Sequence, residues 1–476
     1  MSAVSIRHGQ PAPRRSVLLL LAAVAALAAD AASPPADSPV DAYTEFRRLF
    51  DAGDYPAAVT AAQRVVGLTE AASAADPQNL QAALMNLAYA QRLAEDYVGA
   101  EASYLRVIEL VEAKGRPTDP RLSRAYAGLA YTYHAARRYD IAVPAFETAV
   151  GITRRNEGLF CAEQLPMLEG LADSLTELGR LEEAQRVQSY RLRVGEKRYG
   201  RVDPRGIAIR VAVGRWYARI AAYDPARRML EDALEELERE LGPQDIALVA
   251  PLTALAECNR RQLLYPLDPQ VYGADPERFA MFHDPVTPLA QVMTPRQLAV
   301  DGQRWLERAA AIVEQQQEPL PAQLADVRVQ LGDWFQLLDR HDEALIQYRE
   351  AWKAAQQVDG DHDPLPQKLF GAPLLLHYDP PGFWDRYAGR PPEQIELRSV
   401  DIDLTVDARG LGTDPVVVND AGDEYFVEAA LKAAETARYR PRFADGEPVP
   451  TTGIRFSQPF MVLIETEEPA QAPARR

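Results

Sequence analysis

The sequence predicts a mostly α-helical protein in which a solenoid of stacked helical hairpins is followed by a small α+β domain. Small and apolar residues recur with a constant period of 42 through most of the 476 residues. Near the C-terminus the pattern changes to strict alternation of apolar and polar residues. A chain of this length is also too long for one hydrophobic core, so several folding units are expected.

Residues 1–31 are predicted to be a cleavable secretory signal. Arg7, Arg14 and Arg15 supply positive charge, residues 17–29 form an uncharged apolar run, and small residues suited to cleavage follow. The run is too short to cross a bilayer core of about 30 Å as a helix. We therefore expect an exported protein of the Gram-negative periplasm, with no stable membrane span after cleavage. An uncleaved anchor is the alternative.

Charge and cysteine content narrow the classes of partner. The formal net charge of −17 repels phosphate backbones, and no basic stripe is evident, so nucleic acid is not an expected partner. Cys161 and Cys258 lie about two repeats apart, too far for a disulfide, so two buried free thiols are expected.

The repeat is defined by an aromatic or apolar residue at positions 55, 97, 139, 181 and 223. An alanine follows three residues later in every case, namely Ala58, Ala100, Ala142, Ala184 and Ala226. A helix with a small central residue precedes each position, with Ala88, Ala130, Ala172 and Gly214 at the centres. Small residues let two helices approach closely, and one hairpin cannot bury its own apolar face, so the hairpins must stack.

These repeats resemble the tetratricopeptide repeat (TPR) family, in a variety with a period of 42. In the third unit the family's packing positions are occupied by Tyr126, Leu129, Ala130, Tyr133, Tyr139, Ala142, Phe146 and Ala149. The resemblance implies a TPR solenoid over residues 39–358, with about seven helical hairpins and a Pro-rich insertion near residues 262–296. Long loops in compact folds are often functional; the alternative is that the insertion only packs along the solenoid.

The C-terminal quarter has a different pattern. Residues 359–394 are rich in Pro, Gly and Asp and are predicted to form a linker. Apolar and polar residues then alternate from 395 to 406, which predicts a strand, with a turn at 407–410 and a returning strand at 416–418. A helix over about 423–438 and a final strand over 454–464 are expected next, before a disordered tail at 466–476.

This segment resembles the C-terminal domain of the TonB family. The motifs that carry the likeness are LTVDARG at 404–410, AALKA at 429–433, YRPRF at 439–443, DGEPV at 445–449 and FSQPF at 456–460. Tyr439 stands where the family often has Trp. The resemblance implies a TonB-like domain over 395–465 that captures an extended peptide of an outer-membrane receptor as an added strand. The expected edge comprises Ile454, Arg455 and Phe456.

No set of residues in the sequence predicts catalysis. Gly-rich phosphate loops, nucleophile elbows and zinc-ligand spacings are not found, so we expect no enzyme activity, no cofactor and no metal. Residues 359–363 (DGDHD) lack the ligand spacing of a calcium loop and suit a solvated linker better. An enzyme with a site in the insertion at 266–295 is an alternative hypothesis.

The expected site is a surface for protein partners. The TPR resemblance places a groove on the first helix of each hairpin, at Tyr89, Arg92, Tyr131, His134, Asp173, Glu177, Arg215 and Arg219, and further along at Asp333 and Gln336. Aromatic residues and Arg are frequent interface anchors; the alternative is that these residues only keep the solenoid soluble.

The sequence therefore predicts a periplasmic, non-catalytic scaffold or adaptor. Its groove would bind one protein of the cell envelope, and its C-terminal domain would capture a peptide strand of another. The alternatives are an atypical TonB-family energy transducer or an accessory protein of TonB-dependent transport, although neither a spanning helix nor a long extended linker is recognised in the sequence. The C-terminal domain could instead only cap the last repeat, since terminal repeats must cover their outer face.

Overall fold

The structure is a computed structural model that describes residues 38–72, 77–113, 115, 117–266, 293–358, 364–382 and 390–464. The predicted signal, most of the predicted insertion, the DGDHD segment and the predicted tail lie outside the described residues. The chain divides into two compact units whose boundary, between residues 209 and 210, falls within α9 (Pro204–Arg219).

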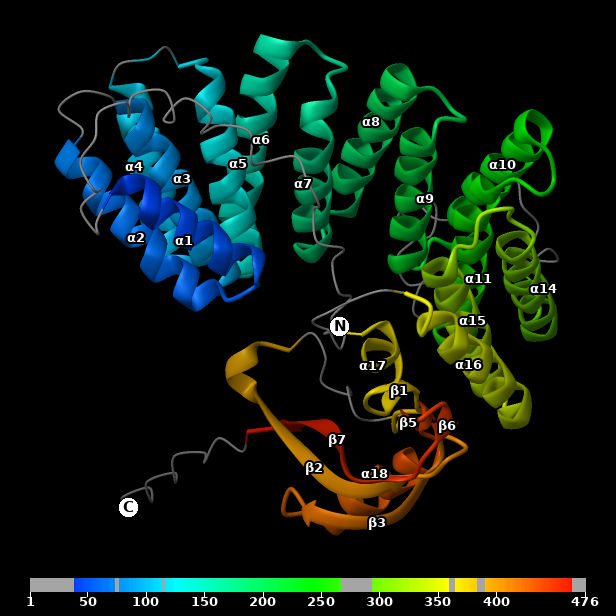
Figure 1. Cartoon of the computed structure of the whole chain (residues 1–476). Helices are drawn as coiled ribbons and strands as arrows, with labels where there is room; N and C mark the ends of the chain where they lie inside the picture. Colours follow the sequence, from blue (N-terminus) through cyan, green and yellow to red (C-terminus); the bar gives the residue numbers. More distant parts are fainter. Residues whose placement is uncertain are drawn as a thin grey trace, which may run out of the picture. The chain divides into compact units, whose positions relative to one another are not determined.

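The first unit consists of helical hairpins (Figure 1). Its helices are α1 (Pro39–Asp51), α2 (Tyr55–Ala72), α3 (Pro77–Leu93), α4 (Tyr97–Glu112), α5 (Pro120–Ala135), α6 (Tyr139–Glu157), the short 3-10 helix η1 (Ala162–Gln164), α7 (Leu165–Glu177) and α8 (Leu181–Tyr199). Each helix from α1 to α8 packs against the next one along the chain. The recurring aromatic or apolar residue is the first residue of α2, α4, α6 and α8.

The second unit begins with further hairpins. Its helices are α10 (Tyr223–Leu241), η2 (Ile246–Leu248), α11 (Val249–Leu264), α14 (Pro295–Glu314), α15 (Pro321–Leu337), α16 (His341–Ala355) and the short α17 (Leu365–Phe370). Successive helices from α10 to α17 pack against each other. The helices α11 and α14, which flank the predicted insertion, are among these packed pairs.

The recurring small residues set the spacing between helices. The alanine in the second helix of each hairpin is 0% exposed at Ala58, Ala100, Ala142, Ala184 and Ala226. At Gly332 in α15, an added Cβ would lie only 2.4 Å from the Tyr348 ring of α16. Close-packed interiors do not accommodate such an atom without rearrangement. The predicted stacking of helices through small residues is thus confirmed.

The predicted change to an α+β domain is also confirmed. The strands β2 (Ile395–Val406), β3 (Gly412–Asn419) and β7 (Thr451–Leu463) form an antiparallel sheet in the order β3-β2-β7. The helix α18 (Glu424–Glu435) packs against this sheet (Figure 1). Phe426 of this helix stacks on Phe460 of β7, with ring centroids 4.5 Å apart. The domain core comprises Val400, Ile402, Leu404, Val406, Ala430, Ala433, Ala434, Ala437, Tyr439, Phe456 and Phe460.

The segment predicted as a linker contributes to this domain. Its strand β1 (Leu374–His377) pairs antiparallel with β4 (Arg438–Arg440), which follows α18. Just after β1, Tyr378 packs edge-on against Phe456 of β7 at 5.0 Å. Two further short strands, β5 (Phe443–Ala444) and β6 (Glu447–Pro448), pair with each other. The predicted linker therefore joins the domain through the pairing of β1 and the packing of Tyr378, whereas Leu374 and Leu375 are exposed.

Cys161 and Cys258 are both buried and free. Burial raises the pKa of the Cys258 thiol to about 12. A thiol with a raised pKa in apolar surroundings is inert, so Cys258 is a packing residue.

Candidate functional site

The C-terminal domain is docked on the last hairpin through a buried ion pair. Arg440 of β4 donates to Asp333 of α15 from Nε to Oδ1 at 2.9 Å and from Nη2 to Oδ2 at 2.6 Å. The two side chains are only 10% and 7% exposed. Tyr348 of α16 donates its hydroxyl to Asp333 Oδ1 at 2.8 Å, and Arg440 also donates to the Leu369 carbonyl of α17 at 3.1 Å. One guanidinium thus connects β4, α15 and α17.

The positive charge of Arg440 is maintained in spite of its burial. Desolvation alone would lower the pKa of Arg440, but the adjacent Asp333 carboxylate outweighs it, and the pKa of Arg440 is raised. Burial, followed by the nearby Asp333 charge, raises the pKa of Tyr348 well above its usual value, so Tyr348 remains a hydroxyl donor. A bidentate contact between an arginine and a carboxylate is geometrically specific, so this contact fixes the docked orientation.

Aromatic residues surround the ion pair. Phe443 of β5 lies 4.8 Å from the Phe370 ring and 6.0 Å from the Trp352 ring, and it meets Tyr348 edge-on at 6.2 Å. Phe443 therefore belongs to the apolar core of the last hairpin, while the other core residues of its own domain form a separate cluster. The exposed end of a repeat array needs a cover, and β5 and α17 supply it for α16.

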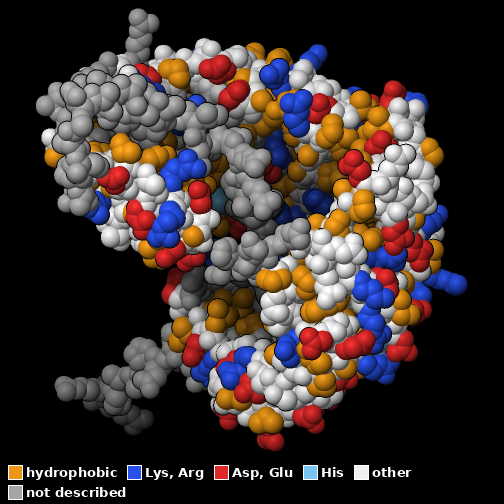
Figure 2. All heavy atoms as spheres, in the orientation of Figure 1, with side chains coloured by type: hydrophobic (Ala, Val, Ile, Leu, Met, Phe, Trp, Pro, Cys, Tyr) orange, Lys and Arg blue, Asp and Glu red, His pale blue; other side chains and the backbone are white. Residues whose placement is uncertain are grey.

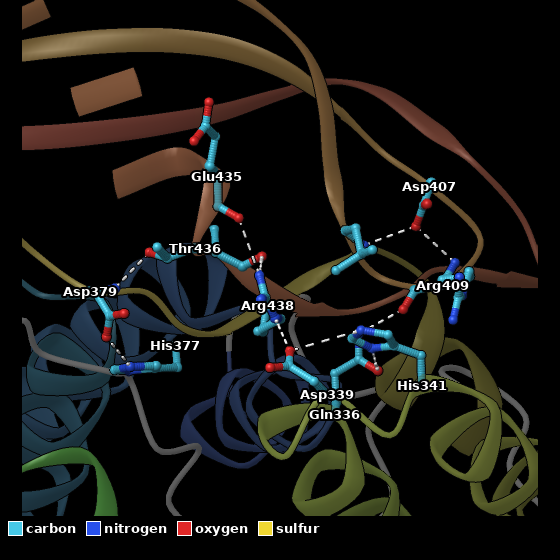
Figure 3. Close-up of polar contacts among 12 residues, drawn as sticks. Gln336, Asp339, His341, His377, Asp379, Asp407, Arg409, Glu435, Thr436 and Arg438 are labelled. Atoms are coloured by element: carbon cyan, nitrogen blue, oxygen red, sulfur yellow. Dashed lines mark hydrogen bonds and ion pairs between the residues drawn. The ribbon is translucent and has the colours of Figure 1, made fainter. Parts of the chain in front are cut away.

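Polar contacts also join the C-terminal domain to the end of α15 (Figure 3). Gln336 donates to the Arg409 carbonyl at 2.6 Å, and Arg438 donates to Asp339 Oδ1 at 2.7 Å. The turn that carries Arg409 needs glycine next to it, because Gly410 has φ +83° and an added Cβ would lie 2.4 Å from Gln336 Nε2. The motif LTVDARG at 404–410, which carries part of the resemblance to the TonB family, thus forms part of the docking contact.

Two of the predicted groove positions are consequently corrected. Asp333 and Gln336 were expected in an open groove, but they are 5% and 0% exposed and bind the C-terminal domain. The repeat pattern could not show that another part of the same chain covers this face of α15. The sequence assigns Arg440 and Phe443, the residues that dock there, only to the YRPRF motif.

A cleft of about 310 Å³ lies beside the junction. Its apolar wall comes from α11 and α15, and His377, Asp379, Thr436 and Arg438 line the opposite side. The polar groups of this side satisfy each other: His377 bonds to Asp379 Oδ1 at 3.1 Å, and the Asp379 backbone N–H donates to Thr436 Oγ1 at 2.8 Å (Figure 3). Within the described ranges, no group of three or more His, Cys, Asp or Glu is placed to hold a metal ion.

His341 is a buried titratable side chain next to the docking contact. It is buried at the start of α16, and its Nδ1 lies 3.2 Å from Gln336 Oε1. Burial lowers its pKa; Arg409 and Arg438 lower it further, while Asp339 and Asp407 act in the opposite direction. Because the folded pKa lies below the unfolded value near 6.5, the unfolded state binds more protons, and stability is lost as the pH falls through and below that value.

We therefore expect the second unit of the wild-type chain to be less stable at pH 5 than at pH 7.5. The variant His341→Gln keeps a polar side chain that does not titrate, and its stability should fall less over the same pH interval. Urea denaturation of both proteins at the two pH values measures the difference. An identical loss in both proteins would show that His341 does not contribute to the acid sensitivity.

In the described part of the chain, β3 and β7 are the two edge strands of the sheet, and the predicted strand-addition edge is the outer side of β7. In antiparallel pairs, directly opposed residues either exchange both backbone hydrogen bonds or exchange none. Ser399 opposes Pro459, and the Ser399 carbonyl accepts from Asn419 of β3 at 2.8 Å, so Ser399 faces β3. Pro459 must then face away from β2. The N–H of Ile464 donates to the Gln394 carbonyl at 3.1 Å, which agrees with even-numbered residues facing β2.

The predicted strand-addition residues can now be placed on β7. Ile454 and Phe456 direct their backbone groups toward β2, and the Phe456 side chain is buried. Arg455 directs its backbone to the outer edge, as does Ser457, which was not predicted. Gly453, with φ +72°, and Pro459 bound this short regular stretch. Bulges and prolines are devices that protect sheet edges, so the accessible window is Arg455 to Ser457.

The predicted groove residues of the first unit lie in a connected row. Tyr89 packs on Phe50 at 5.4 Å, and the Arg92 guanidinium lies 5.0 Å from the Tyr89 ring. Tyr131 meets Phe146 edge-on at 4.9 Å. Burial raises the pKa of Tyr131, with a smaller contribution from the charge of Glu169. These tyrosines are partly buried packing residues as well as surface residues.

The remaining predicted groove residues divide between the two units. In the first unit His134 bonds through Nδ1 to Ser174 Oγ at 2.9 Å, and Asp173 precedes that serine on α7. Arg215 and Arg219 lie in the second unit and are exposed. Arg215 is paired with Glu257 of α11 at 3.0 Å. The structure therefore brings together the groove residues of α3, α5 and α7.

Comparison with known protein families agrees with both resemblances. Residues 79–155 match the tetratricopeptide repeat family model, and residues 399–457 match the family model of the Gram-negative bacterial TonB protein C-terminal domain. The chain therefore combines tetratricopeptide repeats with a TonB-type C-terminal domain. Both are families of interaction domains. No curated protein matches the chain.

Solved structures with similar repeats come from several organisms. TPR-like repeats from Podosopora anserina share 18% identity over 51% of this chain and 100% of theirs, with a TM-score of 0.38. BtubC from P. vanneervenii shares 18% identity over 64% and 92%, with a TM-score of 0.32. The C-terminal part of a TPR repeat-containing protein from Cytophaga hutchinsonii shares 14% over 67% and 95%, with a TM-score of 0.34. Similarity at this level supports no argument about function.

Acidic and basic side chains are interspersed over the face that Figure 2 shows. Across the ranges that the structure describes, no helix combines the length and apolar character needed to cross a membrane.

Proposed function

We propose that this protein is a non-catalytic scaffold of the Gram-negative cell envelope, in which the TonB-type domain caps the repeats and captures an extended peptide along β7. The observation that carries the proposal is that one side of the C-terminal domain is docked on the repeats while the edge strand β7 lies on another side. Arg440 and Phe443 hold one side on the last hairpin. On the other side, the backbone groups of Arg455 and Ser457 face outward without a neighbouring strand in the described part of the chain.

Strand addition suits this edge physically. An added strand forms backbone hydrogen bonds, which give affinity without requiring particular side chains. The Arg455 side chain is held across the sheet by Asp403 at 2.6 Å, and Ser457 Oγ donates to Asp401 at 2.6 Å. Both side chains thus lie over the outer face of β2, away from the edge. A second partner surface is proposed on the first unit, at the row formed by Tyr89, Arg92 and Tyr131.

The substitution Ser457→Pro tests peptide capture. It removes an outward-facing N–H while leaving the pairing with β2 intact, and Ser457→Ala is the matched control because it changes only the side chain. Full-length proteins are crosslinked in the periplasm and purified. We expect the wild type and Ser457→Ala to retain the same envelope protein, and Ser457→Pro to lose it. If Ser457→Pro retains it and Arg92→Glu loses it, the groove is the binding site and the domain is only a cap.

The proposed location has a separate test. The predicted signal implies a mature protein that begins near residue 31 and fractionates with the periplasm. N-terminal sequencing of protein from each cell fraction measures this. An intact leader in the inner-membrane fraction would contradict the proposal and favour the alternative of an atypical energy transducer.

A further inference from the structure

The loop between α6 and α7 exposes two adjacent apolar side chains. Leu159 is 62% exposed and Phe160 is 45% exposed, directly after Gly158, whose φ is +91°. In the equivalent loop two repeats later, which also begins with a glycine at positive φ, Pro243 and Gln244 take these two positions. The repeat fold therefore does not require an apolar pair here.

Hydrogen bonds hold this loop in place. Gln164 is 0% exposed, and its Nε2 donates to the Leu159 carbonyl at 2.6 Å and to the Cys161 carbonyl at 3.2 Å. Its Oε1 accepts from Arg154 Nε of α6 at 3.0 Å, and Tyr190 of α8 donates its hydroxyl to the Leu159 carbonyl. The backbone that carries the two apolar side chains is thus fixed, and their exposure is built into the loop.

Basic side chains lie beside the apolar pair. The Arg154 guanidinium lies 4.3 Å from the centroid of the Tyr190 ring, and the Arg193 guanidinium lies 5.7 Å from the same centroid. Lys197 follows Arg193 by one helical turn, so both side chains lie on one face of α8, and both are exposed. This basic face corrects the expectation that the chain has no basic stripe.

The positive charge is a property of this repeat. Between residues 185 and 201, Arg or Lys stands at 186, 191, 193, 197, 198 and 201, and Glu196 is the only acid. In the next repeat Glu235 of α10 takes the position of Arg193. Two acids, Glu157 and Glu163, flank the loop, but the cations outnumber them. Interactions between exposed charges are screened beyond about 8 Å at physiological ionic strength, so this local excess outweighs the net charge of −17 here.

We propose that this end of the first unit docks on an anionic phospholipid bilayer, with Leu159 and Phe160 entering the headgroup region and Arg193 and Lys197 binding lipid phosphates. The loop and the C-terminal end of α8 lie at the same end of the hairpins (Figure 1). A bilayer accepts an apolar pair at a loop tip without a fitted pocket. Its affinity for a protein rises with inserted apolar area and with attraction between basic residues and anionic lipids. This surface is separate from the β7 edge and does not depend on peptide capture.

The experiment uses residues 32–476, because the apolar run of the predicted leader would itself bind lipid. The protein is sedimented with vesicles of phosphatidylcholine alone and with vesicles of equal parts phosphatidylcholine and phosphatidylglycerol. The first variant, Leu159→Ser with Phe160→Ser, removes the apolar tip. Its control, Val98→Ser with Leu105→Ser, replaces two exposed apolar residues of α4.

The second variant, Arg193→Glu with Lys197→Glu, reverses two charges beside the tip. Its control, Arg47→Glu with Arg48→Glu on α1, makes the same change of net charge elsewhere in the unit. The changed side chains lie at the surface, so all four proteins should fold, which circular dichroism checks. Each basic residue near an anionic surface contributes roughly fivefold to partitioning, so the charge variant should lose more than about tenfold.

We expect the wild type and both controls to sediment with the mixed vesicles and to stay in solution with phosphatidylcholine alone. The tip variant should also partition roughly tenfold more weakly, because it no longer inserts apolar area. A wild type that does not bind the mixed vesicles, or a tip or charge variant that binds them as well as the wild type, would overturn the proposal. Binding of the wild type to poly-glutamate but not to vesicles would also overturn it and would assign the surface to an acidic polypeptide.

Discussion

Replacing Arg440 by methionine should destabilise the second unit by about 3–5 kcal/mol, because the Asp333 carboxylate would remain buried without its counter-charge. The side chain of Asp333 is only 7% exposed, so water cannot replace the guanidinium without opening the junction. Tyr348 would still donate one hydrogen bond to Asp333. A single neutral donor does not compensate a buried charge. Urea denaturation of the full chain, followed by its tryptophan fluorescence, measures the loss; Trp352 at the junction is one of the five tryptophans that contribute.

The double variant Asp333→Asn with Arg440→Met separates the ion pair from simple packing. It removes both charges and leaves an amide oxygen for Tyr348, and replacing both partners of a buried pair is often close to neutral. We expect the double variant to recover most of the stability that Arg440→Met loses. If the single variant costs less than about 1 kcal/mol, the value typical of an exposed pair, then the ion pair is not desolvated and the domain is not firmly docked.

The repeats could be predicted from the sequence because their determinants are local. Each hairpin needs a small residue where two helices meet, and the same requirement recurs with every repeat, so Ala58 and Ala100 mark equivalent contacts. The α+β domain could be predicted for a similar reason. Its strand alternation from Val400 to Val406 reports one buried face, and the burial pattern of β2 follows that alternation.

The docking contact could not be predicted in this way. Asp333 and Arg440 are 107 residues apart and belong to different folding patterns, and neither pattern requires the other. A repeat pattern indicates which helix face is available, but it does not indicate what covers that face. Asp333 therefore looked like a groove residue. A buried aspartate and a buried arginine in separate motifs would have been the only sequence signal, and burial of either residue was not evident beforehand.

The open edge of β7 was predictable in part. The family motif placed the edge at the final strand. Which of Ile454, Arg455 and Phe456 directs its backbone groups to the open edge depends on which of them face β2. That choice follows from the register of β7 against β2, which opposes Ser399 to Pro459. Pro459 was visible in the sequence and is consistent with an edge strand, since proline in sheets is confined to such positions.

Replacing Phe443 by alanine should separate docking of the TonB-type domain from its folding. The ring packs against Phe370, Trp352 and Tyr348 and contributes to the hairpin core, so its loss should cost about 3–5 kcal/mol in the stability of the docked arrangement. The core around Val400 and Ile402 does not include Phe443. Hydrogen exchange should therefore show faster exchange in α16, α17 and β5, while β2 stays protected.

The control is Phe456→Ala, because Phe456 belongs to the core of the domain itself and packs against Tyr378. This variant should lose protection in β2 and β3 and retain it in α15. Two distinct patterns of exchange would show that the domain folds around its own core and is held on the repeats by a separate aromatic contact. If Phe443→Ala also removes protection from β2, the two clusters form one cooperative unit. The domain could not then leave the last hairpin without unfolding, and any peptide captured on β7 would be bound to a rigid extension of the repeats.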